Sequence, residues 1–324
     1  MTLADSFGRT FHYLRLSVED ACDYRCRYCL PHGYKKEEPE PPLSVDEIRR
    51  LTAAFADMGF WKVRLTGGEP TLRRDLVDIV AAVKSAPGVR RVALSTNGAR
   101  LFDLADGLAK AGVGAVNVSV DSLNQNRFRE ITGHDHLPQI LAGIGRAHEL
   151  GMDVKVNAVL MKGLNDQEFS QFVELTREKP LGVRFIELMP TADNMDFFTE
   201  RHLKAESLVS WLNENGWKET PRAEADGPAR QFKKAGHSGS VGVIAPYSKD
   251  FCSTCNRLRV TSRGRLRMCL FAEGDHSLRP LLQRDDQLRE LQDNVRNLLG
   301  RKDVSHYLPD GKIGNTRHFA AIGG

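Results

Sequence analysis

The sequence predicts an α/β fold: an incomplete (β/α)6 barrel of the TIM type, with a C-terminal β-rich and helical extension that closes the barrel mouth. Short apolar runs alternate with helical segments from about residue 11 to residue 190, which is typical of a parallel sheet with right-handed crossovers. Six such units are fewer than the eight of a closed barrel. Because the pattern changes after residue 190, we expect a barrel region at 1–190 and a C-terminal region at 191–324.

Six runs rich in Val, Ile and Leu are predicted as strands: Tyr13–Val18, Lys62–Thr66, Arg91–Thr96, Ala115–Val120, Asp153–Met161 and Gly182–Met189. A helix begins at Ser44, where Glu47 completes a capping box. Further helices are expected near Asp75–Ser85, Leu101–Ala111, Leu137–Leu150 and Asp166–Glu178. The C-terminal region should contain a helix near Leu203–Asn215, a polar segment at Pro221–Gly239, a β-rich stretch at Val241–Leu270 and a helix near Gln283–Leu299.

The composition is that of an ordinary globular protein, with 324 residues, 41% of them apolar and 27% charged. A net charge of +4 is too small to indicate nucleic-acid binding, but it suits an anionic small ligand if the cations gather in a cleft. No apolar run has the length of a membrane span, and the N-terminus lacks the pattern of a secretory signal. We therefore expect a cytoplasmic protein whose cysteines are thiols, metal ligands or catalysts.

Each of the first five predicted strands has one polar side, whose residues alternate with Leu, Val or Ala. The outer face of a barrel packs on helices, so these polar residues should point into the lumen. Buried cations without partners would be costly, which indicates a polar, anionic ligand inside the barrel. The alternative is an open sheet with one wet face, although parallel sheets are nearly always covered on both faces. The polar sets are Arg15 and Ser17; Arg64 and Thr66; Ser95 and Asn97; Asn117, Ser119 and Asp121; and Lys155 and Asn157.

All six cysteines fall in two groups of three, with spacings C-x3-C-x2-C and C-x2-C-x13-C. Three thiolates in a short loop leave one position open on a zinc ion or a four-iron cluster, and an open position is typical of chemistry rather than of a structural site. His32 could complete the first group as a zinc site, so zinc is not excluded by counting ligands. The two groups are Cys22, Cys26 and Cys29, and Cys252, Cys255 and Cys269.

The second cysteine group includes a predicted hairpin that turns at residues 262–264. Alternation on its two arms places Cys255, Arg257, Arg259 and Cys269 on one face. Arginines beside a metal centre favour a functional site over a solvated basic hairpin.

Together these motifs resemble the radical S-adenosylmethionine (SAM) superfamily, and within it the GTP 3′,8-cyclase family of molybdenum cofactor biosynthesis. The resemblance extends from Phe11 to the end of the chain. It rests on the first cysteine group with Tyr28, on Gly67-Gly68-Glu69-Pro70, on the second cysteine group with Cys255-Asn256-Arg257-Leu258-Arg259, and on the Gly323-Gly324 tail.

The resemblance implies two [4Fe-4S] clusters, each held by three cysteines. The first would bind and reductively cleave SAM to a 5′-deoxyadenosyl radical, and the second would hold the purine of GTP. The radical would remove hydrogen from ribose C3′, and that carbon would attack guanine C8. The implied partners are GTP, an electron donor and a downstream pterin-forming enzyme, without nucleic acid or membrane; a homodimer is common by base rate.

The resemblance also implies roles for individual residues. The cysteines and the glycine pair, Gly323 and Gly324, would belong to the catalytic machinery. The residues implied for SAM are Tyr28, Gly68, Ser119 and Met189, and those for GTP are Arg15, Arg64, Ser95, Lys155, Arg257, Leu258 and Arg259. Ser95 stands where the family has threonine, and its hydroxyl is retained. Alignment by eye leaves Lys162 as an alternative to Lys155.

Two other functions compete with this one. A radical SAM enzyme acting on another substrate, such as a peptide, would usually carry more C-terminal cysteines than three. A zinc module that docks nucleic acid or protein would not need six βα units.

Overall fold

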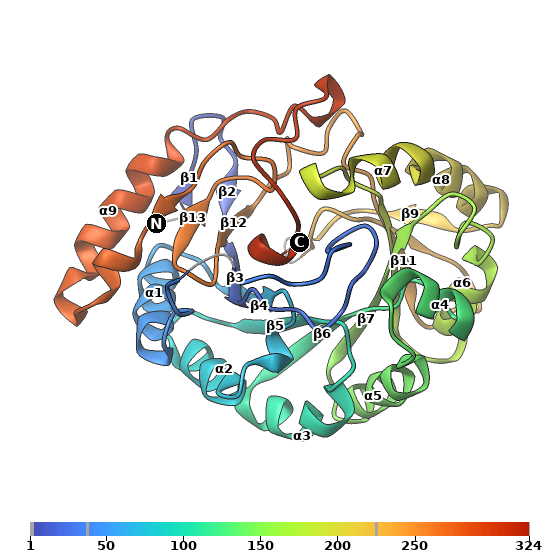
Figure 1. The fold of residues 1–324 in the computed structure, drawn as a ribbon, viewed down its shortest axis with the longest axis horizontal. Helices are drawn as coiled ribbons and strands as arrows, with labels where there is room; N and C mark the ends of the chain where they lie inside the picture. The colour runs from blue at the N-terminus through green and yellow to red at the C-terminus, as the bar shows by residue number, and fades with distance from the viewer. Residues whose placement is uncertain (1–2, 37–38, 224–225, 324) are drawn as a thin grey trace.

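A twelve-stranded mixed sheet dominates this computed structural model, which describes residues 3–36, 39–223 and 226–323. Six neighbouring strands of the sheet are parallel and follow chain order, so the α/β class is confirmed. The sheet curves around the middle of the molecule, and the last described residues lie inside that curve (Figure 1). The parallel strands are β3 (Tyr13–Glu19), β4 (Lys62–Gly67), β5 (Arg91–Thr96), β6 (Val113–Ser119), β7 (Asp153–Leu160) and β8 (Gly182–Glu187).

The C-terminal region adds strands to both edges of this parallel set. On one edge β12 (Arg257–Val260) runs parallel to β3, and β13 (Arg265–Arg267) and β14 (His276–Ser277) continue antiparallel. On the other edge β11 (Ser240–Ile244) runs parallel to β8, followed by the antiparallel strands β10 (Arg230–Lys233) and β9 (Lys218–Thr220). Among the described residues the sheet thus ends at β14 and β9 and does not close on itself.

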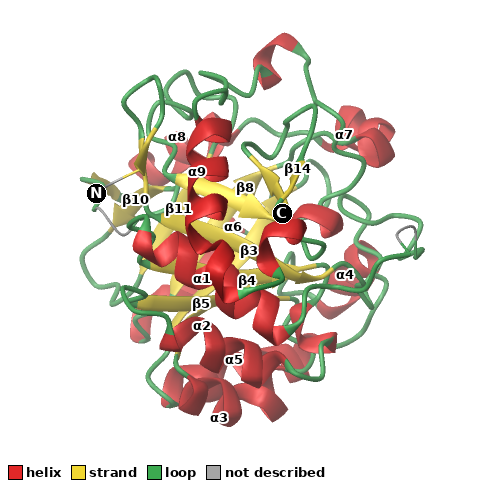
Figure 2. Ribbon diagram, turned by 90° about the vertical axis from the view of Figure 1, so that its left-hand side faces the viewer, coloured by secondary structure: helices red, strands yellow, loops and turns green. Residues whose placement is uncertain are grey.

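Helices cover the outer side of the curved sheet, and Figure 2 shows α2, α3 and α5 gathered below the strands. Their bounds are α1 (Val45–Asp57), α2 (Leu76–Ser85), α3 (Leu101–Ala111), α4 (Gln125–Thr132), α5 (Leu137–Glu149) and α6 (Phe169–Glu178). The later part of the chain adds α7 (Met195–Arg201), α8 (Ala205–Glu214) and α9 (Leu288–Leu299), and a small ribbon pairs β1 (Leu3–Ala4) with β2 (Thr10–Phe11). No helix of the described residues is long and apolar enough to cross a membrane.

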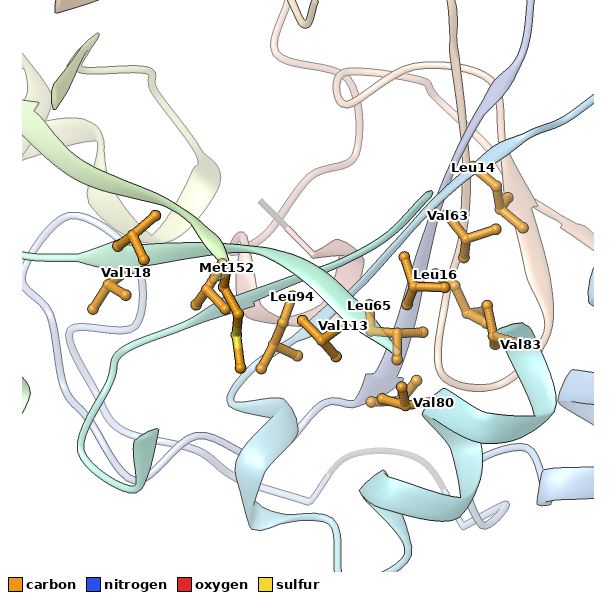
Figure 3. Close-up of a cluster of buried hydrophobic side chains, with 14 of the residues drawn as sticks. Leu14, Leu16, Val63, Leu65, Val80, Val83, Leu94, Val113, Val118 and Met152 are labelled. Carbon is orange, nitrogen blue, oxygen red and sulfur yellow. The ribbon is translucent and has the colours of Figure 1, made fainter. Parts of the chain in front are cut away.

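The core lies between the sheet and these helices. Alternate residues of the strands point outward into it, including Leu14, Leu16 and Val63, and α2 contributes Val80 and Val83 (Figure 3). Each such side chain contributes about 1.5–3 kcal/mol when it is fully buried. Because the outward positions hold this core, the intervening positions of the same strands face the inside of the curve.

The predicted elements match the structure closely in the first half of the chain and less well in the second. The first half differs mainly at α4, a polar helix that the apolar pattern missed, since Asn124 caps it and only one face is buried. The expected helix near Gln283–Leu299 begins at Leu288 instead, after two 3₁₀ turns. The polar segment Pro221–Gly239 contains β10, which pairs with β11 and β9 and has one buried side chain, Phe232, so it lacks an apolar signature.

The capping box at the start of α1 is present and can be tested by mutation. The Ser44 hydroxyl accepts a hydrogen bond from the Glu47 amide at 3.2 Å, and the Glu47 carboxylate accepts from the Ser44 amide at 2.8 Å. Ser44→Ala should lower the free energy of unfolding by about 1 kcal/mol, measured by urea denaturation. Ser85→Ala is the matched control, because that exposed hydroxyl only donates to the Ala82 carbonyl and its loss should change little. Equal effects of the two variants would contradict the capping role.

Candidate active site

A cavity lies on the inner side of the curved sheet and is lined by the polar faces of the parallel strands. Both cysteine groups line this same cavity, although they are separated by more than 220 residues in the chain. Of the residues proposed above, those that line it are Arg15, Cys22, Cys26, Tyr28, Cys29, Arg64, Gly68, Ser95, Ser119, Met189, Cys252, Cys255, Arg257, Arg259 and Cys269.

The six cysteines are free thiols, and the two groups lie in different electrostatic surroundings. Burial raises the pKa of Cys26 well above its usual value and that of Cys29 to about 12. Burial also opposes ionisation of Cys255, but the nearby cations Arg257 and Lys302 outweigh it and lower the pKa of that thiol. The second group therefore lies on the cationic side of the cavity.

Each cysteine group presents three thiols to the cavity. Within residues 3–36, 39–223 and 226–323, no three His, Cys, Asp or Glu side chains are spaced to hold one metal ion. The cysteines of a four-iron cluster each bind a different iron, so they stand further apart than the ligands of one ion. His32, the candidate fourth zinc ligand, is exposed and does not line the cavity. With three cysteines from each group facing the cavity, the open corner of each cluster would be accessible to a ligand.

The Gly67-Gly68-Glu69-Pro70 motif ties together the ends of three strands. The amides of Gly68 and Glu69 donate to the carbonyls of Glu19 and Ala21, each at 2.8 Å. A Cβ on Gly68 would lie 2.3 Å from the Ala21 carbonyl oxygen, so only glycine allows this approach. The buried Glu69 carboxylate accepts four hydrogen bonds, from the Thr71 amide and hydroxyl, the Thr96 hydroxyl and the Asn97 amide.

Tyr28 and Met189 are held on one side of the first cysteine group. The Tyr28 hydroxyl donates to Asp121 at 2.9 Å, and the second Asp121 oxygen accepts from the Val159 amide at 2.8 Å. Asn194 donates through its side-chain amide to the carbonyls of Tyr28 and Met189. Burial raises the pKa of Asp121 to about 6 despite these two hydrogen bonds. This network fixes the loop that carries the cysteines against the ends of β6 and β7.

A cationic wall faces the same cavity from β3, β4 and β12. The Arg64 guanidinium donates to the Tyr13 hydroxyl at 2.6 Å, to the Leu94 carbonyl at 3.1 Å and to the Ser95 hydroxyl at 3.3 Å. Burial lowers the pKa of Arg15 to about 10, and burial beside Arg15 and Arg257 lowers the pKa of Arg259 well below its usual value. Such desolvated guanidinium groups are suited to planar, bidentate contacts with carboxylate or phosphate.

The C-terminal tail reaches this wall from the opposite direction. Arg15 and Arg259 both donate to the Gly323 carbonyl at 2.8 Å. Gly323 has a φ of +64°, and a Cβ there would lie 2.3 Å from a Thr66 methyl carbon, so the position requires glycine. Phe319 packs in one apolar cluster with a cysteine of each group. Gly324 lies outside the described residues.

Two of the proposed substrate residues do not line the cavity. The Lys155 ammonium pairs with Asp153 near the start of β7, although it remains close enough to Arg184 to feel its charge. Lys162, the alternative, does not line the cavity either. Leu258 is fully buried and packs in the core, because it alternates with Arg257 and Arg259 on β12. A role for Leu258 would therefore have to come from its backbone.

Sequence reasoning missed three residues that line the cavity beside the arginines: Tyr13, Lys62 and Arg184. The signal for Arg184 was present, since it alternates with Val183 and Phe185 on β8 as the other cations do on their strands. Burial lowers the pKa of Arg184 to about 10. Tyr13 and Lys62 are the first residues of β3 and β4, and alternation places them on the same faces as Arg15 and Arg64, so a signal was present for both.

Comparison with known proteins decides the family. Residues 16–176 match the family model described as Radical SAM superfamily, and residues 181–308 match Molybdenum Cofactor Synthesis C. A protein of Stenotrophomonas maltophilia strain R551-3, named GTP 3′,8-cyclase, is 53% identical over 323 residues, covering 99% of both chains. The chain belongs to the GTP 3′,8-cyclase family of radical SAM enzymes. A protein of Yersinia pestis with the same name is 45% identical, again over 99% of both chains.

Solved structures agree on the fold. Streptococcus suis SuiB bound to S-adenosylmethionine superimposes with a TM-score of 0.64 at 14% identity, covering 89% of this chain and 68% of SuiB. The hydrogenase maturase HydG gives a TM-score of 0.51 at 18% identity over 62% of this chain and 48% of its own. At such identities the likeness concerns the fold alone.

Proposed function

We propose that this chain is a lyase that converts GTP into (8S)-3′,8-cyclo-7,8-dihydroguanosine 5′-triphosphate, the first step of molybdenum cofactor biosynthesis. The observation that carries the proposal is one cavity lined by two separate cysteine groups, with a wall of arginines beside the second. Relatives named GTP 3′,8-cyclase at 45–53% identity over nearly the full chain support the same activity.

The first cysteine group would hold one [4Fe-4S] cluster and bind SAM at its open iron. Gly68, Ser119 and Met189 line the same cavity and would contact SAM, together with Tyr28, which is hydrogen-bonded to Asp121. When bound, this cluster and SAM supply the radical chemistry. The contribution of the chain is to hold SAM against the substrate and to shield the reaction from water within a lined cavity.

The second cysteine group would hold the other [4Fe-4S] cluster and leave one iron open to the purine. Arg257 and Arg259 on β12 lie next to this group, and Arg15 and Arg64 continue the cationic wall across β3 and β4. A triphosphate carries several negative charges, so buried guanidinium groups are the partners that it needs. The Ser95 hydroxyl, already bonded to Arg64, would complete this substrate site.

A peptide substrate is the main alternative, since SuiB bound to its precursor peptide SuiA also superimposes with a TM-score of 0.64, at 13% identity. That likeness shows a shared fold and does not extend to the substrate. Several cations line the cavity of this chain, and they suit a polyphosphate better than a neutral peptide.

The finer architectural and cellular assignments belong to the same proposal. The six parallel strands would form an incomplete (β/α)6 barrel at 1–190, and residues 191–324 would carry the second cluster and close the barrel mouth. We place the enzyme in the cytoplasm, with an electron donor, a downstream pterin-forming enzyme and a homodimeric state as further expectations.

Anaerobic turnover is the direct test of the proposed function. Reconstituted enzyme with SAM, GTP and a low-potential reductant should consume GTP and release 5′-deoxyadenosine in step with the cyclised product, measured by chromatography and mass spectrometry. Formation of 5′-deoxyadenosine without loss of GTP would refute the proposed cyclase activity and favour another substrate.

Measuring iron content tests whether each cysteine group holds its own cluster and whether the metal is iron or zinc. Anaerobically prepared protein should be brown and contain about eight irons per chain. Cys269→Ala and Cys26→Ala should each fall to about four irons, but only Cys26→Ala should lose SAM binding, because its cysteine belongs to the first group. A colourless wild-type protein that holds only zinc would exclude both clusters.

Gly68→Ala should lower SAM affinity by at least about tenfold, because the added Cβ would force the loop away from the carbonyls of Asp20 and Ala21. Equilibrium binding to the cluster-loaded protein measures the change. Gly145→Ala is the control, since nothing lies within 4 Å of a Cβ at that position and alanine favours helix. Unchanged SAM binding by Gly68→Ala would remove this loop from the site.

A further inference from the structure

Tyr13 is a buried phenol surrounded by cations. Its side chain is only 4% exposed, and its oxygen accepts the 2.6 Å hydrogen bond from Arg64 Nε. The Lys62 ammonium lies 4.4 Å from the centre of its ring, and Arg15 is also hydrogen-bonded to it. The charged groups that face the phenol come from four strands: Arg15 on β3, Lys62 and Arg64 on β4, Arg184 on β8, and Arg257 and Arg259 on β12.

A neutral hydroxyl accepts the hydrogen bond from Arg64 but leaves the charge of the surrounding cations uncompensated. The ring alone would fill the same space, and a neutral phenol offers little compensation for several buried cations. Among acidic groups, Asp153 and Asp226 act on Arg184, and Asp153 also acts on Lys155. Although burial opposes it, the attraction of Arg64, Arg15 and Lys62 lowers the pKa of Tyr13 to about 6.

The position of Tyr13 coincides with the substrate wall. Arg64 and Arg15, which the phenol oxygen holds, are two of the residues assigned to GTP. A phosphate group that binds these guanidinium groups in place of the phenol brings its own negative charge next to the phenolate. Two anions at that spacing repel each other, so the phenolate would take up a proton.

We infer that Tyr13 is a positioning and specificity-determining residue of the nucleotide site: as a phenolate it holds Arg15 and Arg64, and binding of a polyphosphate displaces it with uptake of one proton. The inference rests on the proposed binding of GTP. Tyr13 thereby makes the site specific for a polyphosphate over an uncharged ligand, because only an anion displaces the phenolate.

The first experiment follows the phenol directly. Holoenzyme with oxidised clusters is labelled with [ζ-¹³C]tyrosine and studied by NMR at pH 8, where one of the six tyrosines should show the downfield resonance of a tyrosinate. Burial raises the pKa of Tyr24, Tyr28 and Tyr247, so none of these should produce it. Addition of GTP should move the resonance to the phenol position, whereas guanosine should not. A resonance that is neutral before GTP, or unchanged by it, would overturn the inference.

The second experiment measures GTP affinity between pH 6 and pH 8 for wild type and Tyr13→Phe. Because GTP binding takes up a proton, the affinity of the wild type for GTP should fall as pH rises. The free phenol is about half protonated at pH 6 and about 1% protonated at pH 8. The ratio of the wild-type Kd to the Tyr13→Phe Kd should therefore increase about 50-fold across this range. Ionisation of GTP affects both proteins and largely cancels in the ratio.

Tyr307→Phe is the control, because that tyrosine does not line the cavity and contacts Lys312. Its pH profile should match the wild type. Parallel profiles for wild type and Tyr13→Phe, with both proteins binding GTP, would refute the role of Tyr13 and leave the cyclase intact. Absence of GTP binding to wild type would instead remove the proposed function and this inference with it. Iron content of each variant confirms folding, and the NMR experiment remains decisive if Tyr13→Phe does not fold.

Discussion

The burial of several cations inside the curve of a parallel sheet is the constraint on which the rest of this structure depends. Each strand turns its apolar side to the helices, so its arginines and lysines must face inward. Their desolvation is costly, and the cost is offset by the few acceptors nearby, such as the Tyr13 oxygen and the Gly323 carbonyl. These acceptors compensate only part of the positive charge, so the interior is suited to bind a multiply charged anion.

The two edges of the sheet explain how one cavity can serve two clusters. Because β12 pairs with β3 in parallel register, Arg257 lies opposite Tyr13 and Arg259 opposite Arg15. The same pairing brings the second cysteine group to the strand that leads into the first. In the tail, Phe319 belongs to an apolar cluster that also includes Cys29 and Cys269, so the end of the chain contacts both halves of the site.

Local pattern predicted much of this arrangement. The six strands, the capping box of α1 and the inward polar face followed from period-two alternation and from the cost of burying charge. The same alternation assigned Arg15, Arg64 and Ser119 to the interior. Alternation also set Leu258 apart from Arg257 and Arg259, and its side chain indeed joins the core. The substrate role of Lys155, which pairs with Asp153, stays a prediction.

By itself the sequence determined the fold class, the two cysteine groups and the cationic character of the interior, because each depends on spacing within a few residues. The tertiary structure decided which distant groups meet. It pairs β12 with β3, lets Arg15 and Arg259 donate hydrogen bonds to the Gly323 carbonyl, and places Tyr13 among the cations. Contacts between residues hundreds of positions apart depend on strand order and register across the whole sheet, and no local pattern encodes either one.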